Sequence, residues 1–266
     1  MPSTSNYTSA ADYRTILSNL LLVGSLLIPI LLTQAYAAAD KSITPDEIVE
    51  KADRIRFPAE SFQVNVRITT PRPDQDPEIK EYRVLSKGND RTLLMTTAPA
   101  IDKGNILLMR DHDLWAFLPN LSQPVRLPLG QKLTGEVANG DLARANFSGD
   151  YKATLLRTEE IDGNAYNVLE LNAARRGVTY HRVLYWVNAD NYRPYKAEFY
   201  TLSNRLIKTC HYQGYEDMAG IVRPTQLVME DKLHKDGRSV MDYSGMKLRK
   251  LSDKVFTKNY LKKLSK

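Results

Sequence analysis

The sequence predicts a mainly β protein with few helices, built around one large, curved antiparallel sheet. From residue 62 onward, apolar and polar residues alternate with the period of two that is typical of half-buried strands. Short turn sequences such as Asp162-Gly163 separate these runs, and tight turns join antiparallel neighbours. We expect about ten or eleven strands, and a sheet of that size must curl or close.

One helix should precede the strands. Thr44-Pro45-Asp46-Glu47 has the pattern of a capping box with proline in the first turn. Ile48, Ala52 and Ile55 then fall on one helical face, which predicts a buried stripe. Pro58 should end this helix because proline cannot continue it.

The first group of strands follows directly. Phe62, Val64 and Val66 alternate with polar residues and predict a strand with one buried face. Residues 71–77 (PRPDQDP) are expected to form a loop. Further strands are expected at 79–86, 91–97, 105–109 and 114–118.

Residues 129–150 interrupt the strand rhythm with four glycines and small polar residues. A short helix is expected near Asp141 to Asn146. A long irregular segment in a compact domain is often functional.

The second group of strands is expected at 152–158, 165–172, 178–187, 195–202, 206–212, 225–233 and 238–248. Pro224 should stand at a strand start, where its missing N–H is harmless. Neither an internal repeat nor a low-complexity linker divides the chain, so one domain is expected after the N-terminal segment.

Asp111-His112-Asp113 has the composition of a metal or acid–base site, but neighbouring residues on a tight turn splay apart. We predict an exposed hairpin turn there. The four histidines (112, 181, 211 and 234) lie in different predicted elements, and Cys210 and His211 should face opposite sides of a strand. Nucleophile elbows, phosphate loops and dinucleotide-binding glycine patterns are absent from the sequence. The prediction is a non-enzymatic protein without a metal or cofactor.

Three strands are apolar on both faces: Ile106–Met109, Leu114–Leu118 and Val183–Val187. An antiparallel strand with one solvated face should be polar on that side. These strands therefore need two apolar neighbours, which can be helices, a second sheet or a cavity that holds an apolar ligand. A thick ordinary core is the alternative.

We expect an apolar cavity on the concave face of the curled sheet. Trp115 and Phe117 share one face of their strand, and Leu184 and Trp186 share one face of theirs. The predicted lining comprises Trp115, Phe117, Leu184, Trp186, Phe62, Val64, Val66 and Phe199. The opposite phase, with Leu114, Leu118, Val183, Tyr185 and Val187 inside, stays open.

The N-terminus resembles a secretory signal peptide. Leu20–Leu32 is an apolar core too short to span a bilayer comfortably, and Ala35, Ala37 and Ala39 offer small-x-small cleavage sites. We predict a signal peptide over 1–37 and a mature domain over 38–266 that begins at Ala38 or Asp40. An uncleaved anchor is the alternative. A lipid anchor is excluded because no cysteine follows the apolar core.

Charge is uneven along the chain. The net charge is +6, but residues 247–266 carry eight Lys or Arg against Asp253 alone, so the remainder is near neutral. This basic tail would touch an anionic membrane or an acidic partner, or serve as a solubilising terminus. The overall charge is unlike that of a nucleic-acid binder.

Several stretches together resemble the outer-membrane lipoprotein-sorting family, whose fold is that of the LolA-like carriers. The resemblance spans about residues 44–264 and rests on five stretches in order: Lys103–Pro119, Ile161–Leu171, Arg182–Tyr200, Leu206–Lys208 and Arg223–Asp231. The family usually has a Ser-Phe-Met-Gly-Ser-Asp-Phe-like run where this chain has Gly135–Asp150, so contacts made by that segment can differ.

The resemblance implies a half-open β-barrel with helices covering its concave face and acyl chains held between them. It also implies a periplasmic carrier or accessory protein for lipids or lipoproteins, working beside an exporter of the resistance-nodulation-division type. Two other classes stay open: a docking subunit of an envelope complex with a filled core, and a lipid hydrolase.

Overall fold

The computed structural model describes residues 43–88, 90–234 and 237–264, all within one unit that starts at Ser42. The predicted signal peptide, the predicted mature start and the last two residues of the basic tail lie outside the described residues. No helix in the described ranges is long and apolar enough to cross a membrane.

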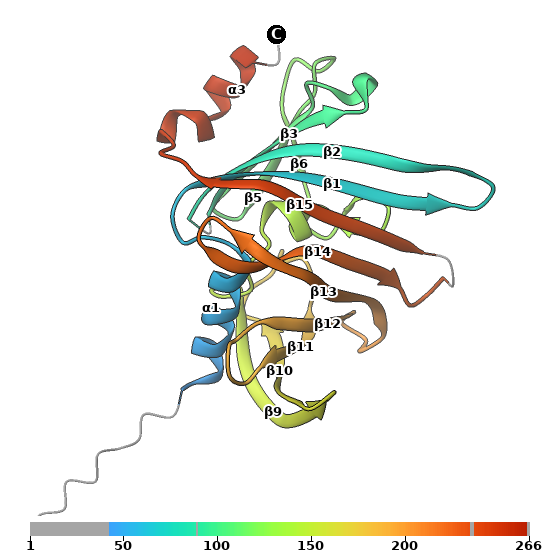
Figure 1. Ribbon diagram of the computed structural model, residues 1–266. Helices are drawn as coiled ribbons and strands as arrows, with labels where there is room; N and C mark the ends of the chain where they lie inside the picture. Colours follow the sequence, from blue (N-terminus) through green and yellow to red (C-terminus); the bar gives the residue numbers. More distant parts are fainter. Residues whose placement is uncertain (1–42, 89, 235–236, 265–266) are drawn as a thin grey trace, which may run out of the picture. The chain divides into compact units, whose positions relative to one another are not determined.

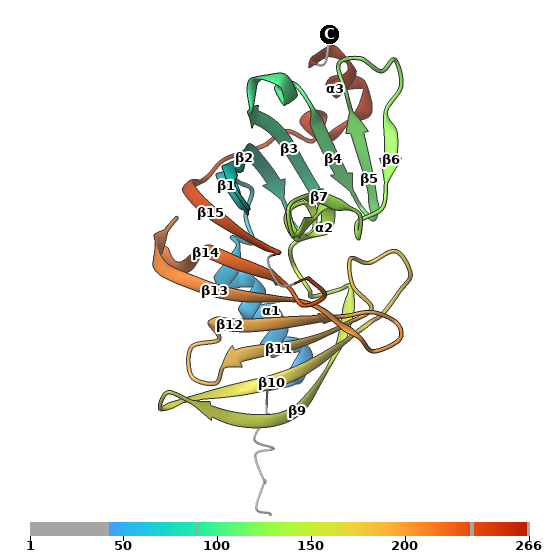
Figure 2. The ribbon, with the colours of Figure 1, turned by 90° about the vertical axis from the view of Figure 1, so that its right-hand side faces the viewer.

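The strands form one large antiparallel sheet, as predicted, but it has thirteen strands rather than the expected ten or eleven. Their order is β6-β5-β4-β3-β2-β1-β15-β14-β13-β12-β11-β10-β9 (Figures 1 and 2). The strands are β1 (Phe62–Arg72), β2 (Gln75–Lys87), β3 (Arg91–Ala98), β4 (Ile106–Arg110), β5 (Asp113–Phe117), β6 (Val125–Leu127), β9 (Tyr151–Ile161), β10 (Asn164–Ala173), β11 (Arg182–Asn188), β12 (Pro194–Tyr200), β13 (Leu206–Met218), β14 (Ile221–Asp231) and β15 (Arg238–Leu248). Neighbours in sequence pair as hairpins, except that β15 pairs β1 and so joins the two halves. In this order of described strands β6 and β9 stand at opposite ends, so the sheet is not closed.

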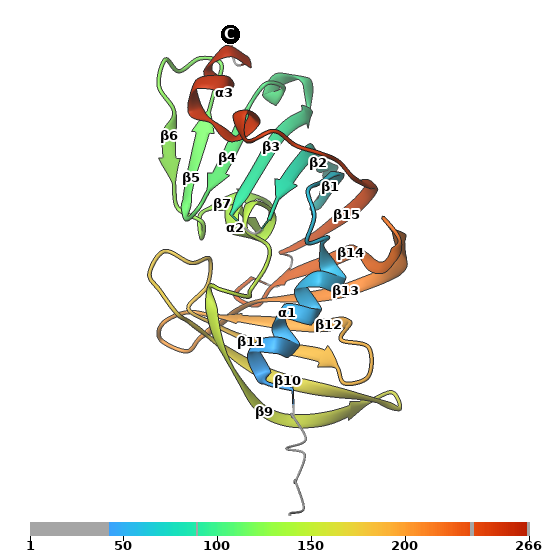
Figure 3. The ribbon, with the colours of Figure 1, turned by 90° about the vertical axis from the view of Figure 1, so that its left-hand side faces the viewer.

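The first helix, α1 (Pro45–Arg56), begins as predicted. Thr44 Oγ1 accepts a hydrogen bond from Glu47 N at 3.3 Å, and Glu47 Oε2 accepts one from Thr44 N at 2.7 Å. The helix lies against β9, β11, β12 and β14 (Figure 3). Its buried face includes Ile48 and Ala52 of the expected stripe, whereas Ile55 is only half-buried. Asp53 and Arg56 are also buried on this face, and two buried charges require partners inside the protein.

A second, smaller group of elements lies between β6 and β9 in the chain. Residues 129–150 contain the hairpin β7 (Lys132–Thr134) and β8 (Val137–Ala138), followed by α2 (Asn139–Ala143). The predicted short helix exists but begins earlier than expected, because Asp141 Oδ2 accepts a hydrogen bond from Ala138 N at 2.8 Å and so caps the helix from within.

The buried apolar residues form two clusters. The inner cluster lies between one face of the sheet and α1 and α2, and it includes Leu94, Met109 and Leu114. The outer cluster contains Leu93, Leu108 and Phe117 with Phe256 and Leu261, which belong to a 3-10 helix (Asp253–Phe256) and to α3 (Lys258–Leu264). Adjacent residues point to opposite faces, so β3, β4 and β5 are covered on both sides.

The second cover of these strands is therefore the C-terminal segment of the same chain. Most of the predicted basic tail is ordered against the sheet, with Phe256 1% exposed and Leu261 fully buried. Asp253, its one acidic residue, pairs with Lys87 at 2.6 Å and Arg91 at 2.7 Å.

Three local predictions were wrong. Residues 71–77 are not a loop, because β1 and β2 turn at Pro73–Asp74 and Pro71 lies where the register shifts between Thr70 and Arg72. Prolines are tolerated at such irregularities. Pro224 lies inside β14 rather than at its start. On the edge of β14 that faces β15, pairing begins only at Gln226, so no inter-strand hydrogen bond to β15 is needed at Pro224.

Residues 178–181 were expected to begin a strand, but β11 starts at Arg182. They pack instead against α2, where Tyr180 Oη donates to the carboxylate of Asp141 at 2.9 Å. Gly140 permits this approach because a side chain there would collide with Thr179.

Candidate functional site

The inner cluster is the candidate site because it combines a large apolar surface with aromatic rings. Its rings include Phe147, Tyr185 and Tyr212, with centroids 5.1 Å apart for Phe147–Tyr185 and 6.0 Å apart for Tyr185–Tyr212. Tyr180 and Phe199 lie 4.2 Å apart on the same side. Such a surface suits an apolar ligand better than a polar one.

Residues 139–150 cross this surface and divide its free space into two clefts. The first encloses about 30 Å³ between Phe57, Phe62 and Tyr243 on one side and Leu142 on the other. The second encloses about 20 Å³ beside Arg56, Tyr212 and Phe199. Residues 144–146 line both clefts. Each cleft has room for about one water molecule, so this structure shows the interior closed.

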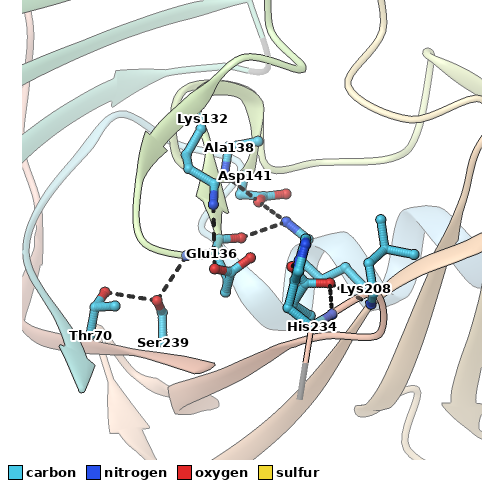
Figure 4. Close-up of polar contacts among 10 residues, drawn as sticks. Thr70, Lys132, Glu136, Ala138, Asp141, Lys208, His234 and Ser239 are labelled. Atoms are coloured by element: carbon cyan, nitrogen blue, oxygen red, sulfur yellow. Dashed lines mark hydrogen bonds and ion pairs between the residues drawn. The ribbon is translucent and has the colours of Figure 1, made fainter. Parts of the chain in front are cut away.

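Polar contacts hold α2 and the preceding β7–β8 hairpin to the sheet (Figure 4). Lys208 Nζ, on β13, lies 2.6 Å from Asp141 Oδ2 and donates to Glu136 O at 2.9 Å. Glu136 N donates to Ser239 Oγ at 2.9 Å. The hydroxyl of Ser239 is 2.8 Å from that of Thr70, so β1, β13 and β15 all contribute to this clamp.

A second set of contacts holds the end of the segment. Asp53 Oδ2, on α1, accepts hydrogen bonds from Phe147 N at 2.9 Å and Ser148 N at 2.7 Å. Arg56 Nη1 donates to Ala145 O at 2.6 Å. These bonds tie the segment to α1 at the point where it separates the two clefts.

Asp150, the last residue of the crossing segment, is held by two arginines. Its carboxylate accepts hydrogen bonds from Arg144 Nη2 at 2.9 Å and Arg175 Nε at 3.0 Å. Burial alone would raise the pKa of Asp150, but the hydrogen bonds and positive charges of Arg144 and Arg175 outweigh it and lower that pKa below its ordinary value. The aspartate is therefore ionised at neutral pH.

Sequence reasoning missed these polar residues. A signal was present for Asp53 and Arg56, because both fall on the apolar face of the predicted helix. Lys208 gave a weaker signal as a charge within a predicted strand. Asp141 was noted only as part of a short helix.

Half of the predicted cavity lining lies in the inner cluster: Phe62, Val64, Val66 and Phe199. Trp115 and Phe117 belong to the outer cluster instead. Lys258 Nζ lies 2.9 Å from the centroid of the Trp115 ring, so α3 covers this tryptophan.

On β11, alternate residues also face different sides of the sheet. Val183, Tyr185 and Val187 belong to the inner cluster, together with Leu114 of β5. Leu184 and Trp186 point to the other face by alternation, and Lys196 Nζ lies 3.9 Å from the Trp186 ring centroid. The structure thus places Leu114, Val183, Tyr185 and Val187 of the alternative phase in the inner cluster, whereas Leu118 is half-buried and belongs to neither cluster. Ligand contact by any of these side chains stays a prediction.

Asp111 and His112 form the predicted hairpin turn between β4 and β5, with Asp111 at a φ of +55°. Asp113 forms an ion pair with Arg126, and the side chain of His112 is exposed. Among the described residues no three His, Cys, Asp or Glu side chains gather as a metal site would require.

Cys210 lies in the inner cluster, where burial raises the pKa of its thiol to about 12. The thiol is therefore protonated at neutral pH and a poor nucleophile. His211, next in the strand, packs near Tyr195 with ring centroids 6.3 Å apart.

The open sheet and its covered apolar interior define a class of β proteins that matches known structures closely. A LolA superfamily protein from Nitrosomonas europaea is 55% identical, with a TM-score of 0.79, and the match covers 82% of this chain and 100% of that chain. A family model described only as an uncharacterized protein matches residues 88–263. This chain belongs to the LolA superfamily.

More distant structures share the fold. An outer membrane lipoprotein-sorting protein domain from Vibrio parahaemolyticus is 22% identical with a TM-score of 0.70, and the match covers 82% of this chain and 98% of that one. A DUF1329 family protein from Desulfovibrio piger has the same identity and TM-score, with 82% and 97% covered. Among curated proteins, none matches the chain.

Proposed function

We propose that this protein is a periplasmic, non-enzymatic carrier that binds the acyl chains of a lipid or lipoprotein for sorting to the outer membrane. Membership of the LolA superfamily supports the carrier class, and the lipoprotein-sorting name of the Vibrio relative supports the cargo. The observation that carries the proposal is the inner cluster, an aromatic and aliphatic surface crossed by residues 139–150, which polar contacts tie to the sheet and to α1.

The acyl chain would lie between the sheet and the helices, with α1 and α2 as the cover of the concave face. Because the two clefts meet at residues 144–146, outward movement of the crossing segment would join them into one space. Each methylene moved from water gains roughly 0.8 kcal/mol. One long chain could therefore contribute on the order of 10 kcal/mol before ordering costs, enough to offset the opening of several hydrogen bonds.

Export and partners complete the proposal. Cleavage of the signal peptide would release mature protein beginning at Ala38 or Asp40, and N-terminal sequencing of periplasmic protein tests this start. An inner-membrane exporter of the resistance-nodulation-division type would supply the cargo. The cationic side of the C-terminal segment would meet the anionic membrane surface.

A docking subunit with a permanently filled core is the second candidate. The small free volumes of about 30 and 20 Å³ favour it, since a core that never opens needs no larger space. The two candidates differ in one measurable property, which is whether the interior accepts an acyl chain.

The test is native mass spectrometry of the purified mature protein with lipid extraction, followed by titration with a fluorescent acyl methyl ester. Two variants at neighbouring positions of β11, one on each face of the sheet, test whether the acyl chain binds at the inner cluster. Val183→Thr places a hydroxyl in the inner cluster and should weaken binding by about 1–2 kcal/mol, whereas Leu184→Thr on the other face should leave it unchanged. Empty extracts and no probe binding to wild type would reject the carrier in favour of the docking subunit.

A further inference from the structure

The inner cluster contains a buried positive charge. Arg56 is 5% exposed, and its guanidinium carbon lies 5.3 Å from the ring centroids of Phe147 and Tyr212. Among the described residues it makes one hydrogen bond, to Ala145 O. A guanidinium has five N–H donors, so most of its capacity is unused.

The counter-charge nearest to Arg56 is poorly placed. Asp53 is 3% exposed, and its Oδ1 lies 3.6 Å from Arg56 Nη1, longer than a hydrogen bond. Asp53 Oδ2 is already engaged by Phe147 N and Ser148 N. Burial raises the pKa of Asp53, so its negative charge is disfavoured and compensates Arg56 weakly.

Two polar atoms beside this arginine lack hydrogen bonds. Neither Asp53 Oδ1 nor the hydroxyl of Tyr185 has a hydrogen-bond partner among the described residues. Tyr185 is fully buried, and its ring packs on Phe147 at a centroid distance of 5.1 Å. A buried polar atom without a hydrogen bond lowers the free energy of unfolding by about 1–3 kcal/mol. A functional role would explain why this protein retains two such atoms.

Another buried arginine, Arg223, has its hydrogen-bond donors satisfied by backbone carbonyls. Arg223 is 2% exposed and donates hydrogen bonds to Met218 O at 3.0 Å, Arg54 O at 2.6 Å and Ile55 O at 3.0 Å. Its contacts anchor the last turn of α1. Arg56 differs because it faces rings and a cleft rather than a set of carbonyls.

We propose that Arg56, assisted by the Tyr185 hydroxyl, receives the carboxylate of a bound long-chain carboxylic acid, whose alkyl chain occupies the inner cluster. This inference rests on the proposed carrier function and takes its cargo to be a lipid with a free acid group rather than a lipoprotein, whose acyl chains are ester- or amide-linked. The planar guanidinium matches a carboxylate through two parallel N–H···O bonds. The two opposite unit charges neutralise each other in the apolar interior.

Binding would exchange one partner for another. Arg56 gives up Ala145 O, which removes one of the hydrogen bonds that hold the crossing segment where the two clefts meet. The carboxylate then takes the donors of Arg56 and the O–H of Tyr185. The same arginine that ties the segment down in the closed structure would thus hold the ligand in the open one.

The experiment compares two fluorescent probes that differ only in the head group, a long-chain carboxylic acid and its methyl ester. Wild type, Arg56→Met and Tyr185→Phe are titrated with each, together with Arg54→Met as the control. Arg54 is on the same helix but exposed and paired with Glu50. Wild type and Arg54→Met should bind the acid at least tenfold more tightly than the ester. Arg56→Met should bind both with similar affinity, and Tyr185→Phe should lose part of the preference.

Ester binding by Arg56→Met also shows that the variant is folded. If Arg56→Met does not fold, the acid preference of Tyr185→Phe still tests the inference. Equal binding of acid and ester by wild type would overturn this inference and leave the carrier function intact. Retention of the acid preference in Arg56→Met would overturn it as well. Failure of wild type to bind either probe would reject the carrier function and the inference with it.

Discussion

The ammonium nitrogen of Lys208, inside β13, lies 2.6 Å from a carboxylate oxygen of Asp141 on α2, and their side chains are 8% and 6% exposed. This ion pair joins two segments 67 residues apart in the chain. It holds α2 over the inner cluster, and the Lys208 ammonium also lies 4.8 Å from the ring centroid of Tyr180 and 5.3 Å from that of Phe199.

Lys208→Met should destabilise the protein by about 3–5 kcal/mol, because it leaves the Asp141 carboxylate buried without its counter-charge. Adding Asp141→Asn should recover part of that loss. Urea unfolding measures both effects. Lys232→Met serves as the control, since its pair with Glu230 is more than a third exposed on both sides and should contribute under about 1 kcal/mol. Equal losses in the two lysine variants would contradict the role given to Lys208.

Asp150 should make stability depend on pH. Its pKa is lowered in the folded protein, where the hydrogen bonds and charges of Arg144 and Arg175 outweigh burial. Its contribution to the free energy of unfolding is therefore fully present above the pKa of the unfolded carboxyl, about 4, and is lost as the pH falls through the folded pKa. The difference in unfolding free energy between wild type and Asp150→Asn should be largest at neutral pH and shrink below about pH 4. A difference that stays constant from neutral to strongly acidic pH would argue against this assignment.

The C-terminal segment should stabilise the sheet without contributing to ligand binding. Phe256 is 1% exposed in the outer cluster, and Phe256→Ala should cost about 3–5 kcal/mol. Thermal or urea unfolding gives the loss, and the affinity for the acyl probe, measured where the variant is still folded, should not change. Lys258→Ala, which removes only the ammonium over Trp115, should cost about 1 kcal/mol or less. Loss of probe affinity in folded Phe256→Ala would show that the outer cluster also serves the ligand.

The turn at Asp111 should respond to backbone conformation and not to side-chain chemistry. Its φ of +55° suits glycine, so Asp111→Gly should be near neutral, whereas Asp111→Val should cost about 1–2 kcal/mol in urea unfolding. His112→Ala should leave stability and metal content unchanged. Stoichiometric bound metal that disappears in His112→Ala would assign this turn a chemical role.

Local patterns determined much of the fold. The capping box at Thr44 and Glu47 placed α1, and Asp162-Gly163 placed a hairpin whose two residues have φ of +49° and +74°. Alternation in β1 identified its buried side. These features depend on residues within a few positions of each other, so the sequence alone determined them. The family resemblance also came from the sequence, and it was confirmed.

Tertiary structure alone decided which apolar face meets which cover. Leu93 and Leu94 are equally apolar, yet Leu93 belongs to the outer cluster with Phe256 and Leu94 belongs to the inner cluster on the side of α2. Nothing near these residues in the chain distinguishes them, because both covering elements are distant from β3 in the sequence. For the same reason the placement of Trp115 and Trp186 away from the inner cluster could not be foreseen.

The polar contacts that hold α2 and residues 145–148 show most clearly what depends on the tertiary structure. Asp141 and Lys208, Asp53 and Phe147, and Arg56 and Ala145 are partners only because the sheet brings distant segments together. The sequence by itself determined a large antiparallel sheet of the LolA superfamily with an apolar interior. The tertiary structure decided that this interior is closed and contains a charged arginine, since burial and hydrogen bonding of a charge depend on neighbours far away in the chain.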